Sequence, residues 1–173
     1  MLQNLDSKKG WAKRRPFVDP LVLDSMCEIQ RRQKADGTSL GAFRPGEVLD
    51  LTIDQDAETW EPSKQAIADQ PSLFFADKAG LEKIPYRVRY RYTCSEPTCP
   101  GHHQTIIDWE LAQSFRNWRE KYETAVLLEK IRERWLGEMC RPDKETLFFV
   151  GSQHLHPAAF LILGVFWPPS PKS

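Results

Sequence analysis

Two segments of the chain alternate between hydrophobic and polar residues, as half-buried β-strands do. The first is VLDLTID, residues 48–54, in which Leu49, Leu51 and Ile53 share one face. The second is YRVRYRYT, residues 86–93, in which the tyrosines fall on one face and three arginines on the other. Because successive side chains of a strand point to opposite faces, each segment predicts a strand with one apolar and one polar face.

Two continuous apolar runs in the last third of the chain predict a buried β-hairpin. They are LFFV, residues 147–150, and FLILGVF, residues 160–166. Their aromatic and aliphatic composition suits central strands. The intervening GSQHLHPAA, about nine residues long, is polar enough for a loop. We therefore expect two central strands joined by a long loop.

Three further segments space their apolar residues as amphipathic helices do. A short helix is expected within DPLVLDSMCEIQRRQK, residues 19–34, and two longer helices over residues 108–120 and 123–139. Together with the strands, this order predicts an α+β fold with a mixed or antiparallel sheet and two central helices. The expected organisation is a basic N-terminal arm at residues 1–16, a single α+β domain at residues 17–167 and a proline-rich tail at residues 168–173.

Overall charge and cysteine content narrow the class of protein. Basic and acidic residues number 24 each, so no net charge attracts the whole molecule to nucleic acid or to a membrane. The first ten residues lack the apolar core of a signal peptide. The longest apolar run, residues 158–167, is about half the length that spans a bilayer. We therefore expect a soluble cytoplasmic protein, in which cysteines are more often thiols or metal ligands than disulfides.

The turn after the second predicted strand contains a cluster of potential zinc ligands. Cys99 and His102 are separated by two residues, Pro100 and Gly101, as in half of a zinc knuckle. Gly101 can supply the positive φ that such a turn needs. Cys94 precedes Cys99 by a spacing that zinc chelates use. Three ligands of suitable type therefore lie in this turn, and zinc is the expected cofactor.

The fourth ligand is the open question. The nearest candidate is His103, although two consecutive imidazoles on one tetrahedral ion require awkward backbone geometry. A water molecule would complete a catalytic rather than a structural site. Without a metal, Cys94 and Cys99 would be small buried hydrophobic residues in an ordinary turn. The remote alternatives, which only the fold could bring close, are Cys27, Cys140, His154 and His156.

The arginine face of the second strand is a candidate for phosphate binding. Arg87, Arg89 and Arg91 repel one another and need solvent, carboxylate partners or a polyanion. With exposed tyrosines to stack on bases, such a face suits nucleic acid. The alternative is cross-strand pairing with Asp50 and Asp54, which lie on the polar face of the first strand.

Catalytic signatures are weak, and the sequence does not decide whether the protein is an enzyme. Asp108 and Glu110 lie where they would cap a helix, although carboxylates also hold magnesium in nucleases. His154 and His156 are spaced to face the same way in an extended segment and could transfer protons or bind a metal. The GxSxG, P-loop, GxGxxG and HExxH motifs are absent from the sequence.

The leading hypothesis is a small zinc-stabilised binding module that contacts nucleic acid through the arginine face. The first alternative is a metal-dependent nuclease or hydrolase that uses the Asp108/Glu110 and His154/His156 pairs. The second is a structural subunit whose apolar C-terminal hairpin docks into a larger assembly. The expected partners are thus nucleic acid or protein, and not a membrane.

Overall fold

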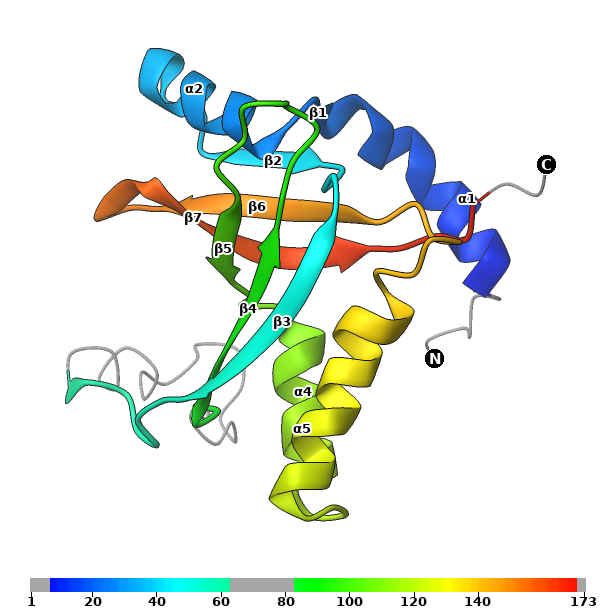
Figure 1. The fold of residues 1–173 in the computed structure, drawn as a ribbon, viewed down its shortest axis with the longest axis vertical. Coiled ribbons are helices and arrows are strands. Elements are labelled where there is room, and N and C mark those ends of the chain that lie inside the picture. The colour runs from blue at the N-terminus through cyan, green and yellow to red at the C-terminus, as the bar shows by residue number, and fades with distance from the viewer. Residues whose placement is uncertain (1–6, 63–82, 171–173) are drawn as a thin grey trace, which may run out of the picture.

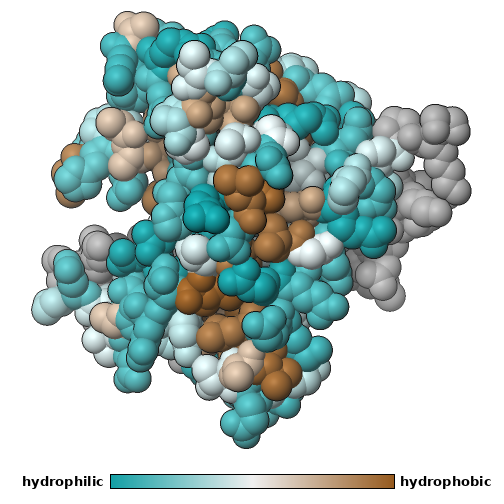
Figure 2. Space-filling model, viewed as in Figure 1, coloured by the Kyte–Doolittle hydropathy of each residue, from teal (hydrophilic) through white to brown (hydrophobic). Residues whose placement is uncertain are grey.

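Two β-sheets pack against each other in the computed structural model, which describes residues 7–62 and 83–170 (Figure 1). Their strands cross at a wide angle, and helices lie around the outside. The described residues form a single compact α+β domain, as the sequence predicts. Its surface in the same view is mostly hydrophilic, with hydrophobic residues gathered along the middle (Figure 2).

The first sheet has the strand order β1-β2-β6-β7. Strands β1 and β2 are parallel, and the other neighbours are antiparallel. The strands are β1 (Val22–Leu23), β2 (Leu40–Phe43), β6 (Leu147–Gln153) and β7 (His156–Phe166).

The C-terminal hairpin is confirmed, but its expected long loop is wrong. Strand β6 continues to Gln153 and β7 begins at His156, so the turn holds only two residues. The segment that looked like a loop is polar because the hairpin tip extends beyond the core, and residues 156–159 are exposed. The Ser152 amide donates a hydrogen bond, 2.8 Å long, to the carbonyl of Ser39, the residue before β2.

The second sheet contains both alternating segments and is antiparallel throughout. Its order is β3-β4-β5. The period-two prediction holds for both segments, except at Leu49, which is 46% exposed because a β-bulge interrupts the register there. The strands are β3 (Val48–Gln55), β4 (Tyr86–Tyr92) and β5 (His102–Thr105).

Aromatic residues from both sheets form the centre of the core. The ring of Tyr90 stacks on that of Phe148 with centroids 4.7 Å apart, and Tyr92 packs against Phe43. Both tyrosine hydroxyls donate a hydrogen bond within the protein, Tyr90 to the Trp135 carbonyl oxygen and Tyr92 to the side-chain carbonyl oxygen of Gln104. Burial raises the pKa of both tyrosines. The tyrosine face of β4 is therefore a core face, and Tyr90 and Tyr92 are not available to stack on bases.

The predicted helices are present, but they begin and end at residues that differ from those expected. The short N-terminal helix begins only after Ser25, whose hydroxyl accepts from the Glu28 amide at 2.9 Å, and it ends at Gly37 with φ of 78°. The last helix changes to a π-helix. The helices are α1 (Ser7–Val18), α2 (Met26–Asp36), α4 (Trp109–Trp118), α5 (Thr124–Arg132) and the π-helix η2 (Glu133–Glu138), with a short 3-10 turn η1 (Asp19–Leu21).

Both terminal segments pack on the domain. Helix α1 begins within the expected basic arm and continues beyond it to Val18, and Trp11 in that helix meets Phe166 edge to face, with centroids 4.9 Å apart. At the other end, the Pro168 carbonyl accepts from the Glu145 amide at 2.9 Å. Within the described ranges, no helix has the length and apolar character to cross a bilayer.

Candidate metal centre

Four potential metal ligands meet where the start of α2 faces the loop between β4 and β5. Cys27 lies in the first turn of α2, and Cys94 follows the end of β4. Cys99 lies in the loop, and His102 is the first residue of β5. Their sulfur and imidazole nitrogen atoms all lie within 4.8 Å of one another. Three separate elements therefore contribute to one Cys₃His cluster.

Three of the separations between these atoms are close to those of a tetrahedral metal site. The Cys27 and Cys94 sulfurs are 3.4 Å apart. The Nε2 atom of His102 lies 3.5 Å from the Cys27 sulfur and 3.3 Å from the Cys99 sulfur. Around a tetrahedral zinc ion, two sulfurs would lie about 3.8 Å apart and a sulfur and a nitrogen about 3.6 Å apart. Each of the three separations is thus within about 0.4 Å of the value expected around a tetrahedral ion.

The cluster is largely shielded from solvent and has four protein donors. Cys94 is 6% exposed and His102 is 8% exposed, whereas Cys27 and Cys99 are half-buried. Structural zinc sites use four protein ligands, whereas catalytic sites keep one position open for water or substrate. The donor set is therefore that of a closed structural site.

The loop is shaped so that backbone amides point at the Cys99 sulfur. The amides of Cys94 and Gly101 each donate to it at 3.4 Å. Gly101 has φ of 85°, the positive value expected from the sequence. The Cys99 amide itself bonds to the Glu96 carbonyl at 3.0 Å and closes the turn. Such amide donors favour a thiolate over a thiol and suit a metal-bound sulfur.

Polar contacts hold the loop against α2 independently of the cysteines. Arg31 donates two hydrogen bonds to the Glu96 carboxylate, at 2.8 and 2.9 Å, and the Ser25 hydroxyl donates a third. These bonds lower the pKa of Glu96 to about 2. The Ser95 hydroxyl also donates to the Asp24 carbonyl at 3.0 Å. The two halves of the cluster are thus brought together by neighbouring side chains.

Three of the four potential ligands have pKa values shifted from their usual ones, and in different directions. Burial, together with the hydrogen bonds and charges of Cys94 and Cys99, raises the pKa of Cys27 to about 12, which opposes its ionisation in the absence of a metal. Burial also opposes ionisation of Cys94, but donation from the Glu96 amide and from the neighbouring thiols outweighs it, and its pKa is lowered. Burial lowers the pKa of His102. His102 is therefore a neutral imidazole at neutral pH, as a ligand must be.

The cluster contains three of the four ligands expected from the sequence. Cys94, Cys99 and His102 belong to it, whereas His103 points to the opposite face of β5, with Nε2 3.0 Å from the Thr52 hydroxyl. Cys27 lies where His103 was expected. It is 67 positions from Cys94 and had been considered only as a remote alternative. Because Cys27 lies in a helix far along the chain from the other ligands, no ligand spacing in the sequence pointed to it.

The arginine face of β4 is partly neutralised by acidic residues. Arg89 bonds to Asp54 at 2.7 Å, and Arg87 lies 3.5 Å from Asp56. Asp50 lies opposite Arg91 across the strands but forms its ion pair with Arg132, at 2.8 Å. Arg91 is exposed and has no ion pair with another described residue. Of the two aspartates expected to pair across the strands, Asp54 pairs with an arginine of β4 and Asp50 does not. Carboxylate partners are found for two of the three arginines, Arg87 and Arg89.

The residues of the enzyme hypothesis do not converge. Asp108 caps α4 by accepting from the Glu110 amide at 2.6 Å, and it lies beside Gly164 of β7. His154 and His156 are exposed at the hairpin tip. From His156 to Gly164, β7 runs roughly 25 Å. Across residues 7–62 and 83–170, the Cys₃His cluster is the only group of three or more potential ligands close enough to hold an ion.

Comparisons with known proteins identify a family but no activity. The chain matches no curated protein and no solved structure. The sequence model of one family, described as "Domain of unknown function (DUF8757)", matches residues 22–173. The matched region includes the whole Cys₃His cluster and both sheets. The chain therefore belongs to this family, DUF8757.

Proposed function

We propose that the protein is a zinc-stabilised binding module, in which one structural Zn²⁺ is held by Cys27, Cys94, Cys99 and His102. The observation that carries the proposal is the close approach of these four donor atoms, all within 4.8 Å of one another. Three thiolates and one imidazole form a standard structural zinc set. Because all four positions are taken by protein atoms, the ion would have no site for a substrate.

The ion would act as a clamp between the N-terminal and central parts of the chain. It would join α2 to the β4–β5 loop and close a long segment of chain between Cys27 and Cys94. A metal bound only by the folded state adds its binding free energy to folding. The hydrogen bonds of Glu96 to Arg31 and Ser25 would position the two halves before the ion binds.

A protein is favoured over nucleic acid as the partner of this module. Two of the three arginines on β4 have carboxylate partners, and Tyr90 and Tyr92 are fully buried. Of these three arginines, only Arg91 remains for phosphate, and the chain has no net charge to assist it. Apolar residues, by contrast, are exposed around the C-terminal strand, for example Leu163 at 40%.

Removal of the metal tests the structural role. We expect chelation to lower the thermal unfolding midpoint by more than about 10 °C, because a structural ion contributes several kcal/mol to folding. Adding back stoichiometric Zn²⁺ should restore the midpoint. Loss of bound metal with no change in unfolding or in amide exchange at α2 would contradict the proposal and point to an open site instead.

A further inference from the structure

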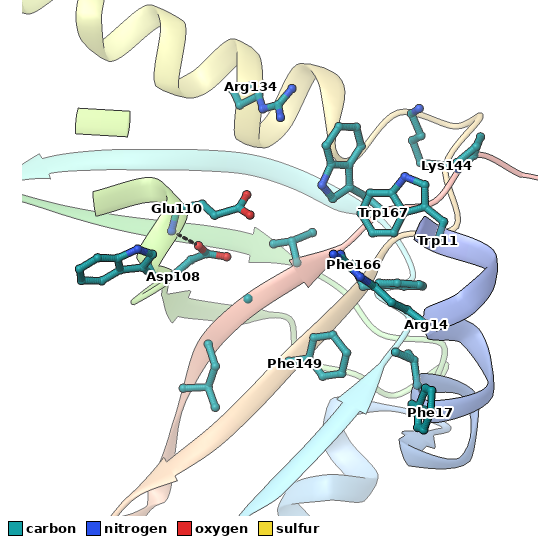
Figure 3. Close-up of a pocket in the computed structure, with 16 residues that line it drawn as sticks. Trp11, Arg14, Phe17, Asp108, Glu110, Arg134, Lys144, Phe149, Phe166 and Trp167 are labelled. Carbon is teal, nitrogen blue, oxygen red and sulfur yellow. Dashed lines mark hydrogen bonds between the residues drawn. The ribbon is translucent and has the colours of Figure 1, made fainter. Parts of the chain in front are cut away.

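A groove of about 1040 Å³ runs along the last part of β7, between α1 and the start of α4 (Figure 3). Phe149 and Leu163 contribute to its apolar lining. Aromatic residues lie on both sides, Phe17 from α1 with 77% exposure and Trp109 from α4 with 61%. Large apolar side chains exposed around one concave surface are typical of an interaction site.

One side of the groove is an open strand edge. Strand β7 is the terminal strand of its sheet. On its outer side, the Ile107 amide donates to the Ile162 carbonyl at 2.8 Å. Over residues 163–166, β7 receives no further backbone partner on that side from any described residue. An unpaired edge presents amides and carbonyls that another extended chain can bond.

The two ends of the groove differ in charge. Asp108 and Glu110 point toward it from the α4 end (Figure 3), and neither forms an ion pair with a described residue. Only one carboxylate oxygen of Asp108 is engaged in capping the helix. At the other end, Arg14 lies above Trp11, with its guanidinium carbon 5.6 Å from the ring centroid. A bound chain would therefore be oriented by its charges.

We propose that this groove binds an extended peptide segment of a partner protein, which adds a strand to the open edge of β7. Apolar side chains of the peptide lie on Phe149 and Leu163, and a basic side chain pairs with Asp108 and Glu110. Strand addition is an established mode of peptide recognition. The two carboxylates favour a basic side chain at the α4 end of the groove, whereas the other charged residues that line it, Arg14, Arg134 and Lys144, are basic. The inference rests on the protein-partner part of the proposed function and does not depend on zinc.

Three synthetic peptides test the mode of binding on the purified chain of residues 1–173. The first is a blocked nine-residue peptide in which valine alternates with lysine. The second has glutamate in place of lysine, and the third repeats the first with alternate backbone amides methylated. We expect the lysine peptide to shift the amide NMR signals of residues 163–166 and 108–110. The methylated peptide should bind at least about tenfold more weakly, because it cannot donate the strand hydrogen bonds.

A charge reversal with a matched control tests the specificity. Glu110→Lys should weaken binding of the lysine peptide by about three- to tenfold and strengthen binding of the glutamate peptide. Glu129→Lys, an exposed reversal on α5 outside the groove, should change neither. Zinc content, measured on the same samples, should be normal in all of them, so failure here is distinct from failure of the metal proposal.

Several outcomes would overturn the inference. Signal changes outside the groove would do so, as would equal affinity for the methylated peptide or equal effects of Glu110→Lys and Glu129→Lys. Concentration-dependent shifts at residues 163–166 without peptide would instead assign the strand edge to a second copy of this chain. Binding of a single-stranded oligonucleotide at the same amides, in preference to the lysine peptide, would make nucleic acid the occupant.

Discussion

At the scale of single residues, the metal cluster depends on which way two adjacent histidines point. His102 and His103 are both in β5, where successive side chains face opposite ways, and only His102 faces the cysteines. The imidazole of His102 stacks on Tyr92, with centroids 5.1 Å apart. Sequence spacing alone could nominate both histidines. Had residues 102–105 been recognised as a strand, alternation would have shown that only one of the two histidines can face the cysteines.

The histidine pair gives the first prediction. His102→Ala should abolish stoichiometric zinc and destabilise the fold by about 3 kcal/mol or more, because it removes one of the four ligands and with it the binding free energy of the ion. His103→Ala should keep the metal and change stability by less than about 0.5 kcal/mol, as exposed substitutions do. Elemental analysis and denaturant unfolding measure both. Equal metal loss in the two variants would refute the ligand assignment.

Gly46 is a second residue on which the metal loop depends. Its amide donates to the Thr93 carbonyl at 2.8 Å, and a Cβ atom at Gly46 would lie 2.8 Å from the Cys94 carbonyl oxygen. Gly46→Ala should therefore destabilise the protein by about 1–3 kcal/mol through displacement of backbone. Gly137→Ala is the control, because its Cβ meets nothing closer than 4.0 Å in η2, and it should be neutral or stabilising. A neutral Gly46→Ala would mean that the loop can shift freely.

At the scale of elements, β3 is joined to the last helix by the ion pair of Asp50 and Arg132. The hydrogen bond from Arg132 lowers the pKa of Asp50 below its usual value of 3.8, helped by the Leu51 amide and opposed by partial burial. A carboxyl whose pKa is depressed in the folded state stabilises the protein above its unfolded pKa. That contribution is lost as the pH falls through the folded value.

The pH dependence of Asp50 is the third prediction. Both side chains are about one-third exposed, at 32% and 39%, so solvent screening limits the pair to roughly 1 kcal/mol. Asp50→Asn should therefore unfold more easily than the native chain at neutral pH, and the difference should vanish at a pH below the folded pKa. Comparison at each pH cancels the acid sensitivity of the thiolates. A difference that grows on acidification would contradict the assignment.

The elements also show where sequence patterns stop being informative. Strands β3 and β4 were predictable because alternation is a local property, and α4 because Asp108 is a local cap. The two-residue turn between β6 and β7 was not predictable, because the strand ends that extend beyond the core are polar and have the composition of a loop. The bulge at Leu49 depends on how β3 pairs with β4, which the segment itself does not specify.

At the scale of the whole molecule, the metal site joins parts of the chain that are distant in sequence. Cys94, Cys99 and His102 lie close enough in the chain to be nominated by spacing. Cys27 reaches them only because α2 packs over the β4–β5 loop, where Arg31 and Ser25 bond to Glu96. Such a ligand is a product of tertiary structure. The packing of α1 through Trp11 against Phe166 is likewise invisible in its basic sequence.

The most direct test of the central claim is zinc content per chain in two cysteine variants purified without a histidine tag. Cys27 belongs to the cluster, whereas Cys140, equally a free cysteine, lies outside it with its sulfur 3.4 Å from the Trp135 carbonyl. We predict about one zinc ion per native chain, none bound stably in Cys27→Ser, and full occupancy in Cys140→Ser. Full zinc occupancy in Cys27→Ser, or no zinc in the native chain, would contradict the claim that this cluster is a structural zinc site.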